Sequence, residues 1–103
     1  MIVAFSIAPS GSSDGTDSVH NAVAAAVKVV RDSGLPNQTD SMFTTIEGDW
    51  DEVFAVVKAA TEAVGQFGSR VSLVLKADIR SGHTGEMTGK VERLEQAIIR
   101  AES

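Results

Sequence analysis

A chain of 103 residues has room for one domain, since single domains most often contain about 100–150 residues. No stretch approaches the roughly 18 consecutive apolar residues that a transmembrane helix needs, and the lack of cysteine excludes disulfides and thiol nucleophiles. The formal net charge of −5 argues against nucleic-acid binding, which favours basic surfaces. No basic segment precedes the first apolar residues, so we expect no secretory signal and a cytoplasmic location.

The first half of the chain predicts a strand, a helix and two short strands. Residues 2–8 are β-branched and apolar, and Pro9 is expected to end that strand. A turn-rich connector over 9–16 leads to a helix over 17–33, where apolar residues recur every three or four positions. Residues 37–48 lack the helical period and fit two short strands, with a tight turn near Asp40 and Ser41.

The second half predicts a helix, a strand and a last helix. Asp49 and Glu52 have the spacing of a capping box at the start of a helix that Gly68 ends. Residues 71–79 have the composition of a strand, and a glycine-containing loop over 81–85 follows. The apolar side of the last helix comprises Met87, Val91, Leu94 and Ile98.

This order of elements predicts an α+β domain over residues 1–103. Its first six elements match a ferredoxin-like βαββαβ sandwich, in which two helices cover one face of an antiparallel sheet, and the C-terminal helix is an addition. Side chains alternate across strands, so Val3, Phe5 and Ile7 are expected under the helices. The opposite, open face mixes charged and apolar residues, which is typical of an interface or a pocket between two sheets. Its polar residues are expected to be Ser6, Thr45, Glu47, Ser72, Lys76 and Asp78.

Two segments resemble the thiamine-binding protein family, the YkoF-like group of small ferredoxin-fold proteins. These segments are VAFSIAP over 3–9 and MFTTIEGDWDEV over 42–53, and RVS over 70–72 and KAD over 76–78 add to them. The resemblance covers nearly the whole chain, and the IEGDWDEV run is its most specific part. It implies binding of thiamine or its hydroxymethylpyrimidine moiety rather than catalysis. It also implies homodimers that commonly pair into homotetramers, with self-association supplying the second repeat.

The resemblance makes Glu47 the main candidate for the ligand site. A carboxylate can accept from the amine of an aminopyrimidine and from its protonated ring nitrogen, in a two-point bond. The alternative is a plain ion pair between Glu47 and Lys76 across the sheet. Thr44 fits the family motif better than Thr45, yet alternation turns Thr44 toward the helices unless a bulge intervenes. The other candidate ligand-binding residues are Thr45, Thr44, Ser6, Phe43 and Asp78.

Other kinds of chemistry have weaker support in the sequence. Two histidines without shared ligand spacing predict no metal site, and no cofactor is expected beyond the bound ligand. Ser6, His83 and Asp78 lack the local pattern of a nucleophile elbow, so we expect no enzyme. Phe43 and Val74 make the open face more apolar than in relatives. They favour the alternative function, a structural or regulatory homo-oligomer with a vestigial pocket, whereas Glu47 among apolar neighbours favours a binding protein.

Overall fold

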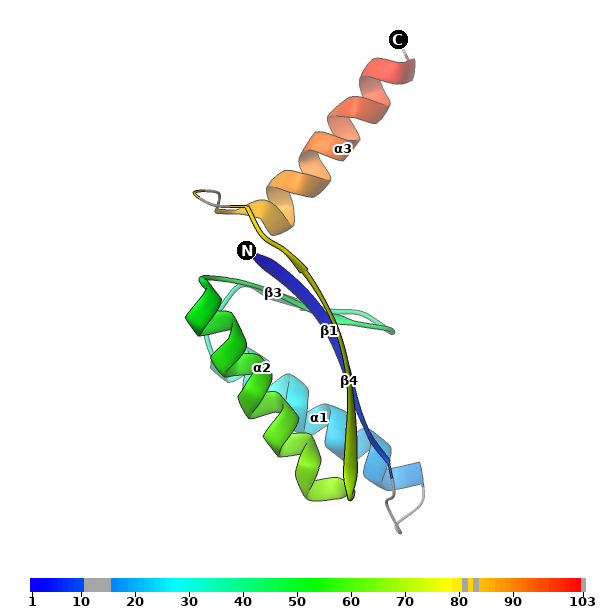
Figure 1. Cartoon of the computed structure of the whole chain (residues 1–103). Coiled ribbons are helices and arrows are strands. Elements are labelled where there is room, and N and C mark those ends of the chain that lie inside the picture. Colours follow the sequence, from blue (N-terminus) through cyan, green and yellow to red (C-terminus); the bar gives the residue numbers. More distant parts are fainter. Residues whose placement is uncertain (11–15, 81, 83, 103) are drawn as a thin grey trace.

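The structure, a computed structural model, describes residues 1–10, 16–80, 82 and 84–102 (Figure 1). Most of the predicted connector over 9–16, and His83, lie outside the described residues. The elements are β1 (Ile2–Ser10), α1 (Thr16–Asp32), β2 (Asn37–Thr39), β3 (Thr44–Glu47), α2 (Trp50–Val64), a 3-10 turn η1 (Gly65–Phe67), β4 (Arg70–Asp78) and α3 (Glu86–Glu102).

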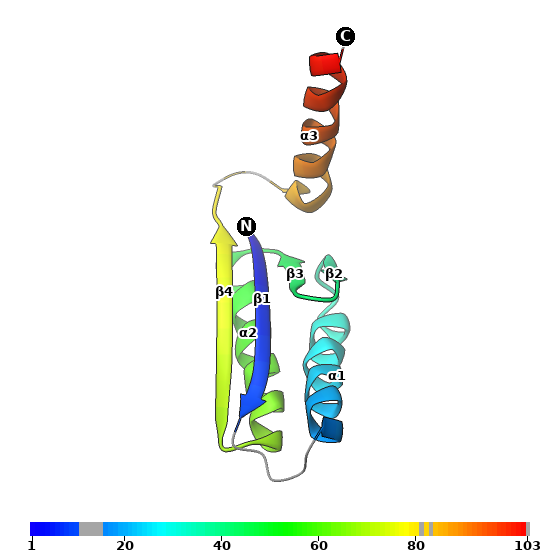
Figure 2. The same ribbon diagram turned by 90° about the vertical axis from the view of Figure 1, so that its right-hand side faces the viewer.

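The strands form one antiparallel sheet in the order β2-β3-β1-β4. Helices α1 and α2 lie side by side on one face of this sheet, and the other face is left without them (Figures 1 and 2). Each of these helices connects two strands that a third strand separates, which is the split βαβ arrangement. The predicted ferredoxin-like class, with an additional C-terminal helix, is therefore confirmed.

The core lies between the sheet and the two helices, as the alternation of β1 predicts. Val3, Phe5 and Ile7 are buried, and so is Ile46, which pairs with Val3 from the neighbouring strand. The register has no bulge between these strands, so Thr44 pairs with Phe5 on the helix side. The helices contribute the buried residues Ala22, Ala26, Val30, Val53, Val57, Ala60 and Val64.

Strand β1 continues through Pro9 to Ser10, so the prediction that Pro9 ends this strand is wrong. Pairing with β4 runs along the whole of β1, whereas pairing with β3 stops at Phe5. Beyond Phe5, β1 therefore has a strand partner on one side, and a proline is tolerated where one edge of a strand needs no donor.

The predicted turn between the two short strands is present, and a carboxylate holds it. Asp40 Oδ1 accepts hydrogen bonds from the backbone amides of Met42 and Phe43, each at 2.8 Å. The amides of Phe43 and Met42 hold the pKa of Asp40 below its usual range. Local side-chain chemistry of this kind explains why the hairpin was predictable from the sequence.

Helix α3 projects beyond the end of the sheet, and both views show it leaving the two-layer body (Figures 1 and 2). Residues 91–102 are all exposed, so its first turns alone rest against the body. The radius of gyration is 15.9 Å, compared with about 13 Å for a compact domain of 100 residues. The projecting helix accounts for this elongated shape, which measures 56 × 30 × 19 Å.

Among the glycines that the structure describes, Gly68 is the one for which a side chain has least room. A Cβ at this position would lie 2.8 Å from the carbonyl oxygen of Ser10 and 3.2 Å from Cβ of Pro9. We expect Gly68→Ala to lower the free energy of unfolding by about 1–3 kcal/mol through this overpacking, as measured by chemical denaturation. Gly65→Ala is the matched control, because its Cβ would meet nothing closer than Val71 Cγ2 at 3.9 Å. Equal stability of the two variants would contradict the close approach of Gly68 to Pro9 and Ser10 of β1.

Candidate functional site

The strand register sets out the open face of the sheet residue by residue. Ile2 of β1 lies between Glu47 of β3 and Asp78 of β4, because it is the partner of both. Ala4 is flanked in the same way by Thr45 and Lys76, and Ser6 pairs with Val74. The expected mixture of charged and apolar side chains on this face is therefore present.

The carboxylate of Glu47 binds the beginning of α3. Glu47 Oε2 accepts a hydrogen bond from the amide of Glu86 at 2.6 Å, and Oε1 accepts one from the amide of Met87 at 3.4 Å. The first amides of a helix have no partner within the helix, and the helix dipole favours a negative charge beside them. Glu47 is 6% exposed, so this contact buries a carboxylate that would otherwise need another partner.

In the structure the Glu47 carboxylate does not pair with Lys76, which was the expected alternative; it is bonded to α3. In the described part of the chain, the hydrogen-bond partners of the Glu47 carboxylate are the two amides of α3. Lys76 is exposed and lies on the far side of β1 from Glu47. The sequence could not predict the capping contact, because it joins residues 39 and 40 positions apart.

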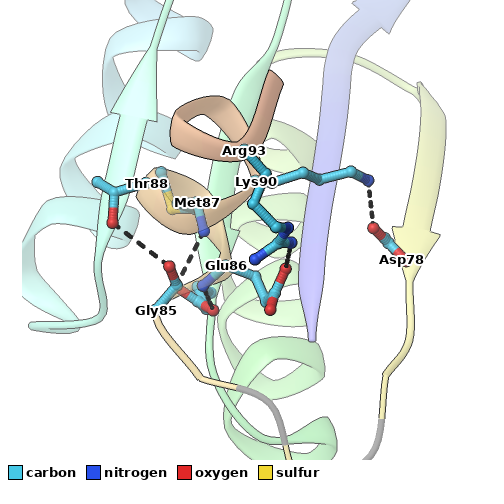
Figure 3. Close-up of polar contacts among 8 residues, drawn as sticks. Asp78, Gly85, Glu86, Met87, Thr88, Lys90 and Arg93 are labelled. Carbon is cyan, nitrogen blue, oxygen red and sulfur yellow. Dashed lines mark hydrogen bonds and ion pairs between the residues drawn. The ribbon is translucent and has the colours of Figure 1, made fainter. Parts of the chain in front are cut away.

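An ion pair between Lys90 and Asp78 adds a second contact between α3 and the sheet (Figure 3). The hydrogen bond and charge of Lys90 hold the pKa of Asp78 below its usual range, and Lys76 and Arg80 act in the same direction. Within the helix, Arg93 Nη2 donates to Glu86 Oε2 at 2.6 Å. Asp78, a predicted ligand residue, therefore serves here to hold α3.

A groove of about 400 Å³ separates the open face from α3, and we call it the sheet–helix groove. This volume lies within the range of about 300–1,000 Å³ that is typical of small-molecule sites. The sheet and the helix each supply both apolar and polar residues. The main lining residues are Ile2, Gln38, Thr45, Met87, Lys90 and Leu94.

Glu47 lies beside a second hollow, of about 330 Å³, which Thr84 and Gly85 border just before the start of α3. Leu35 and Pro36 form its apolar wall, and Gly85 lies at the helix start. The buried carboxylate thus has open space next to it, although its oxygens are bonded to α3.

Three of the predicted site residues lie elsewhere. Ser6, Phe43 and Thr44 line a smaller hollow of about 230 Å³ between β1, α1 and the β2–β3 hairpin. Thr44 is 8% exposed, and its hydroxyl lies 3.4 Å from that of Thr39. Within this one chain the six predicted residues are thus divided: Thr45 lines the sheet–helix groove, Glu47 and Asp78 contact α3, and the other three line the smaller hollow.

Sequence reasoning missed the groove residues Gln38, Met87 and Lys90. Gln38 pairs with Thr45 in the register, so the alternation of β2 could have placed it on the open face. Met87 was expected on the apolar side of the last helix, but its place in the groove, like that of Lys90, depends on where α3 docks, which no pattern in the chain indicates.

Across residues 1–10, 16–80, 82 and 84–102, no cluster of three or more His, Cys, Asp or Glu side chains could hold a metal ion. Among the helices in these same ranges, none is both long and apolar enough to cross a membrane.

The fold defines this chain as a small ferredoxin-like α+β domain with a grooved, open sheet face. Its sequence matches the thiamine-binding protein family over residues 3–95. The chain belongs to this family. Among its relatives, a UPF0045 protein of Mycobacterium bovis is 52% identical over 103 residues, covering 99% of this chain and 98% of that protein. A UPF0045 protein of Synechocystis is 42% identical over 79 residues, covering 76% of this chain and 65% of that protein.

Solved structures share the same architecture. A hypothetical protein of Methanocaldococcus jannascii has a TM-score of 0.77 and 28% identity, covering 91% of this chain and 94% of that one. A domain of unknown function from Bacillus cereus has a TM-score of 0.73 and 29% identity, covering 84% and 83%. A proposed thiamine biosynthesis/salvage protein of Thermotoga maritima has a TM-score of 0.70 and 26% identity, covering 84% and 91%.

The capping contact of Glu47 can be tested by hydrogen exchange. Glu47→Ala removes both acceptor oxygens, so we expect the amides of Glu86 and Met87 to exchange about 10- to 100-fold faster, the range for a lost hydrogen bond to a charged group. Glu47→Gln keeps one acceptor and is expected to lie in between. Glu52→Ala is the matched control, because Glu52 accepts from the Asp49 amide at 3.2 Å and caps α2 instead. Unchanged exchange at Glu86 in Glu47→Ala would contradict the contact.

Proposed function

We propose that this protein binds thiamine or its hydroxymethylpyrimidine moiety, without catalysis, on the open face of the sheet beneath α3. The observation that carries the proposal is the sheet–helix groove, which has the volume of a small-molecule site and lies on the part of the chain that matches the thiamine-binding family. The similarity to a proposed thiamine biosynthesis/salvage protein supports the same ligand class.

The groove and its surroundings have the chemistry that such a ligand needs. The Gln38 amide and the Thr45 hydroxyl can each donate and accept, which suits the ring nitrogens and amine of an aminopyrimidine. Ile2, Met87 and Leu94 provide apolar contact for the ring. Glu47, at the start of α3, would supply a charge-assisted bond to the protonated ring or a counter-charge for the thiazolium cation.

The proposal is one of binding because, among the described residues, Ser6 and Asp78 are not brought together as a hydrolytic site would require. The family is described by what it binds. Asp78 pairs with Ile2, and Ser6 lies four residues further along β1, so Ser6 and Asp78 are about 13 Å apart along the strand direction. This is too far for a shared proton-transfer chain. A cytoplasmic location stays a prediction from the sequence.

We also propose that the ligand site lies at an interface between copies of this chain. Val74 on the open face and Leu94 on α3 are each 58% exposed, and Ile98 continues the same side of the helix. Exposed large apolar side chains on both the open face and α3 are candidates for burial against a partner. A homodimer, or a homotetramer built from two dimers, would cover both the open face and α3.

A second candidate function is a structural or regulatory homo-oligomer with a vestigial pocket. The specific observation in its favour is that the Glu47 carboxylate already has two amide partners. Under this alternative, the groove would be a by-product of the way α3 docks.

Ligand binding can be measured by thermal shift and calorimetry with thiamine, hydroxymethylpyrimidine and thiamine phosphates. At a hundred times its Kd, a ligand stabilises the folded state by about 2.7 kcal/mol, which corresponds to a Tm rise on the order of ten degrees for a domain of this size. We expect Thr45→Val to weaken binding about five- to tenfold, the value of one hydrogen bond. Thr39→Val is the matched control, since Thr39 pairs with Thr44 on the helix side. No shift with any of these compounds at millimolar concentration would favour the structural oligomer.

Self-association can be measured separately by sedimentation. We expect Val74→Asp and Ile98→Asp to shift the protein toward the monomer, because each places a charge in an apolar contact that would be desolvated. Val19→Asp on α1 is the matched control, since Val19 is 44% exposed but lies away from the open face. A wild-type monomer at high micromolar concentration would contradict the proposed interface.

A further inference from the structure

Strand β4 is an outer edge of the sheet, and no described element lies along its outer side (Figure 2). It pairs with β1 over its whole length, Arg70–Asp78, in a continuous register. Neither a proline nor a bulge interrupts it, and these are two of the devices that keep an edge strand from pairing with another chain. The edge is therefore open to a further strand.

The hydrogen bonds of β1 show which β4 residues direct their backbone outward. Met1 and Gly48 exchange both backbone hydrogen bonds, at 2.8 and 3.1 Å, so the odd-numbered residues of β1 bond to β3. Because bonding alternates between the two sides of a strand, the even-numbered residues of β1 bond to the even-numbered residues of β4. The N–H and C=O groups that point outward from β4 are those of Val71, Leu73, Leu75 and Ala77.

A second copy of β4 fits this edge, and the charges of the strand select one antiparallel register. Outward-facing residues must lie opposite each other, so a twofold axis has to pass beside one residue rather than between two. With the axis at Val74, all residues of the strand are paired, and Arg70 lies opposite the partner's Asp78 at both ends. With the axis at Leu73, Arg70 would instead lie opposite the partner's Lys76, a like charge, which is unfavourable.

The two charged ends of β4 are available for these pairs. Arg70 is exposed, and the ion pairs of the described residues do not include it. Asp78 binds Lys90 through Oδ2, which leaves Oδ1 for the partner's Arg70. Its side chain is 44% exposed, so a second cation can reach it.

The middle of the edge is apolar and open to solvent in the single chain. Val74 on the open face is 58% exposed, and Leu73 is 42% exposed although alternation turns it toward the helix side. In the register centred on Val74, this residue lies beside its own copy, and Leu73 lies opposite the partner's Leu75. Apolar cross-strand pairs of this kind stabilise a sheet.

We propose that two copies of this protein pair through β4, antiparallel about Val74, so that their two sheets become one continuous sheet. This inference concerns assembly and does not depend on a bound ligand. The twofold axis is perpendicular to the sheet, so the helices α1 and α2 of both copies lie on one side. The two open faces then lie next to each other on the other side, as one surface that a homotetramer of two such dimers would bury.

Hydrogen exchange tests the pairing on the unaltered protein, because the two sides of β4 respond differently to association. At concentrations where sedimentation gives a dimer, we expect the outward amides of residues 71, 73, 75 and 77 to exchange at least about tenfold more slowly than in the dilute monomer. The amides of Ser72, Val74 and Lys76 are the internal control, since they bond to β1 in both states. A dimer whose outward amides stay unprotected would overturn the pairing and leave the open face as the interface. A protein that stays monomeric at high micromolar concentration would overturn both.

Single cysteines test the register, because the chain has no cysteine of its own. The even-numbered residues would form non-hydrogen-bonded pairs with Cα atoms about 4.5 Å apart, which is close enough for a disulfide. Under mild oxidation we expect Val74→Cys to form an intermolecular disulfide, and a mixture of Ser72→Cys and Lys76→Cys to form a mixed one. Ser72→Cys alone is the matched control, since the two copies of residue 72 would lie about 13 Å apart along the strands. No disulfide in Val74→Cys, or an equally fast one in Ser72→Cys alone, would overturn the register.

Discussion

The sheet is covered by helices on one face only, and this difference between its two faces determines most of what the protein can do. Each crossover helix, α1 and α2, packs on the same side, so the apolar residues of β1 at 3, 5 and 7 are buried there. A four-stranded sheet covered on one side leaves its other side facing water or a partner. The groove, α3 and exposed apolar residues such as Val74 and Leu94 lie on that second side or at its end. The core thus positions the site without contributing a residue to it.

Local chemistry explains why much of the fold was predictable. The Asp40 turn, the Asp49–Glu52 capping box and the alternation of β1 each depend on residues close together in the chain, and each appears as expected. The prediction that Pro9 ends the strand was wrong because a proline is tolerated where one edge of the strand needs no hydrogen-bond donor. That edge exists because β3 is too short to pair with β1 beyond Phe5.

The candidate site was predicted less well because its contacts are long-range. Alternation correctly placed Thr45, Glu47 and Asp78 on the open face, but no pattern within the chain indicates that α3 would dock on two of them. A buried carboxylate needs partners, and the sequence offered Lys76 as the nearest charge. The structure satisfies Glu47 with backbone amides instead, which every residue type supplies and which therefore leave no trace in composition or spacing.

Strand β4 has a consequence for the handling of this protein at high concentration. It forms the outer edge of the sheet over its nine residues, and its central VSLVL run over 71–75 is uncharged, β-prone and free of proline. A long outer strand of this kind is a template for strand addition and for the growth of cross-β fibres. Arg70 precedes the run and Lys76 follows it, so like charges would be stacked at both ends of any in-register fibre. These two cations act as gatekeepers, and neutralising them is the change that would most readily turn a well-behaved domain into an aggregating one.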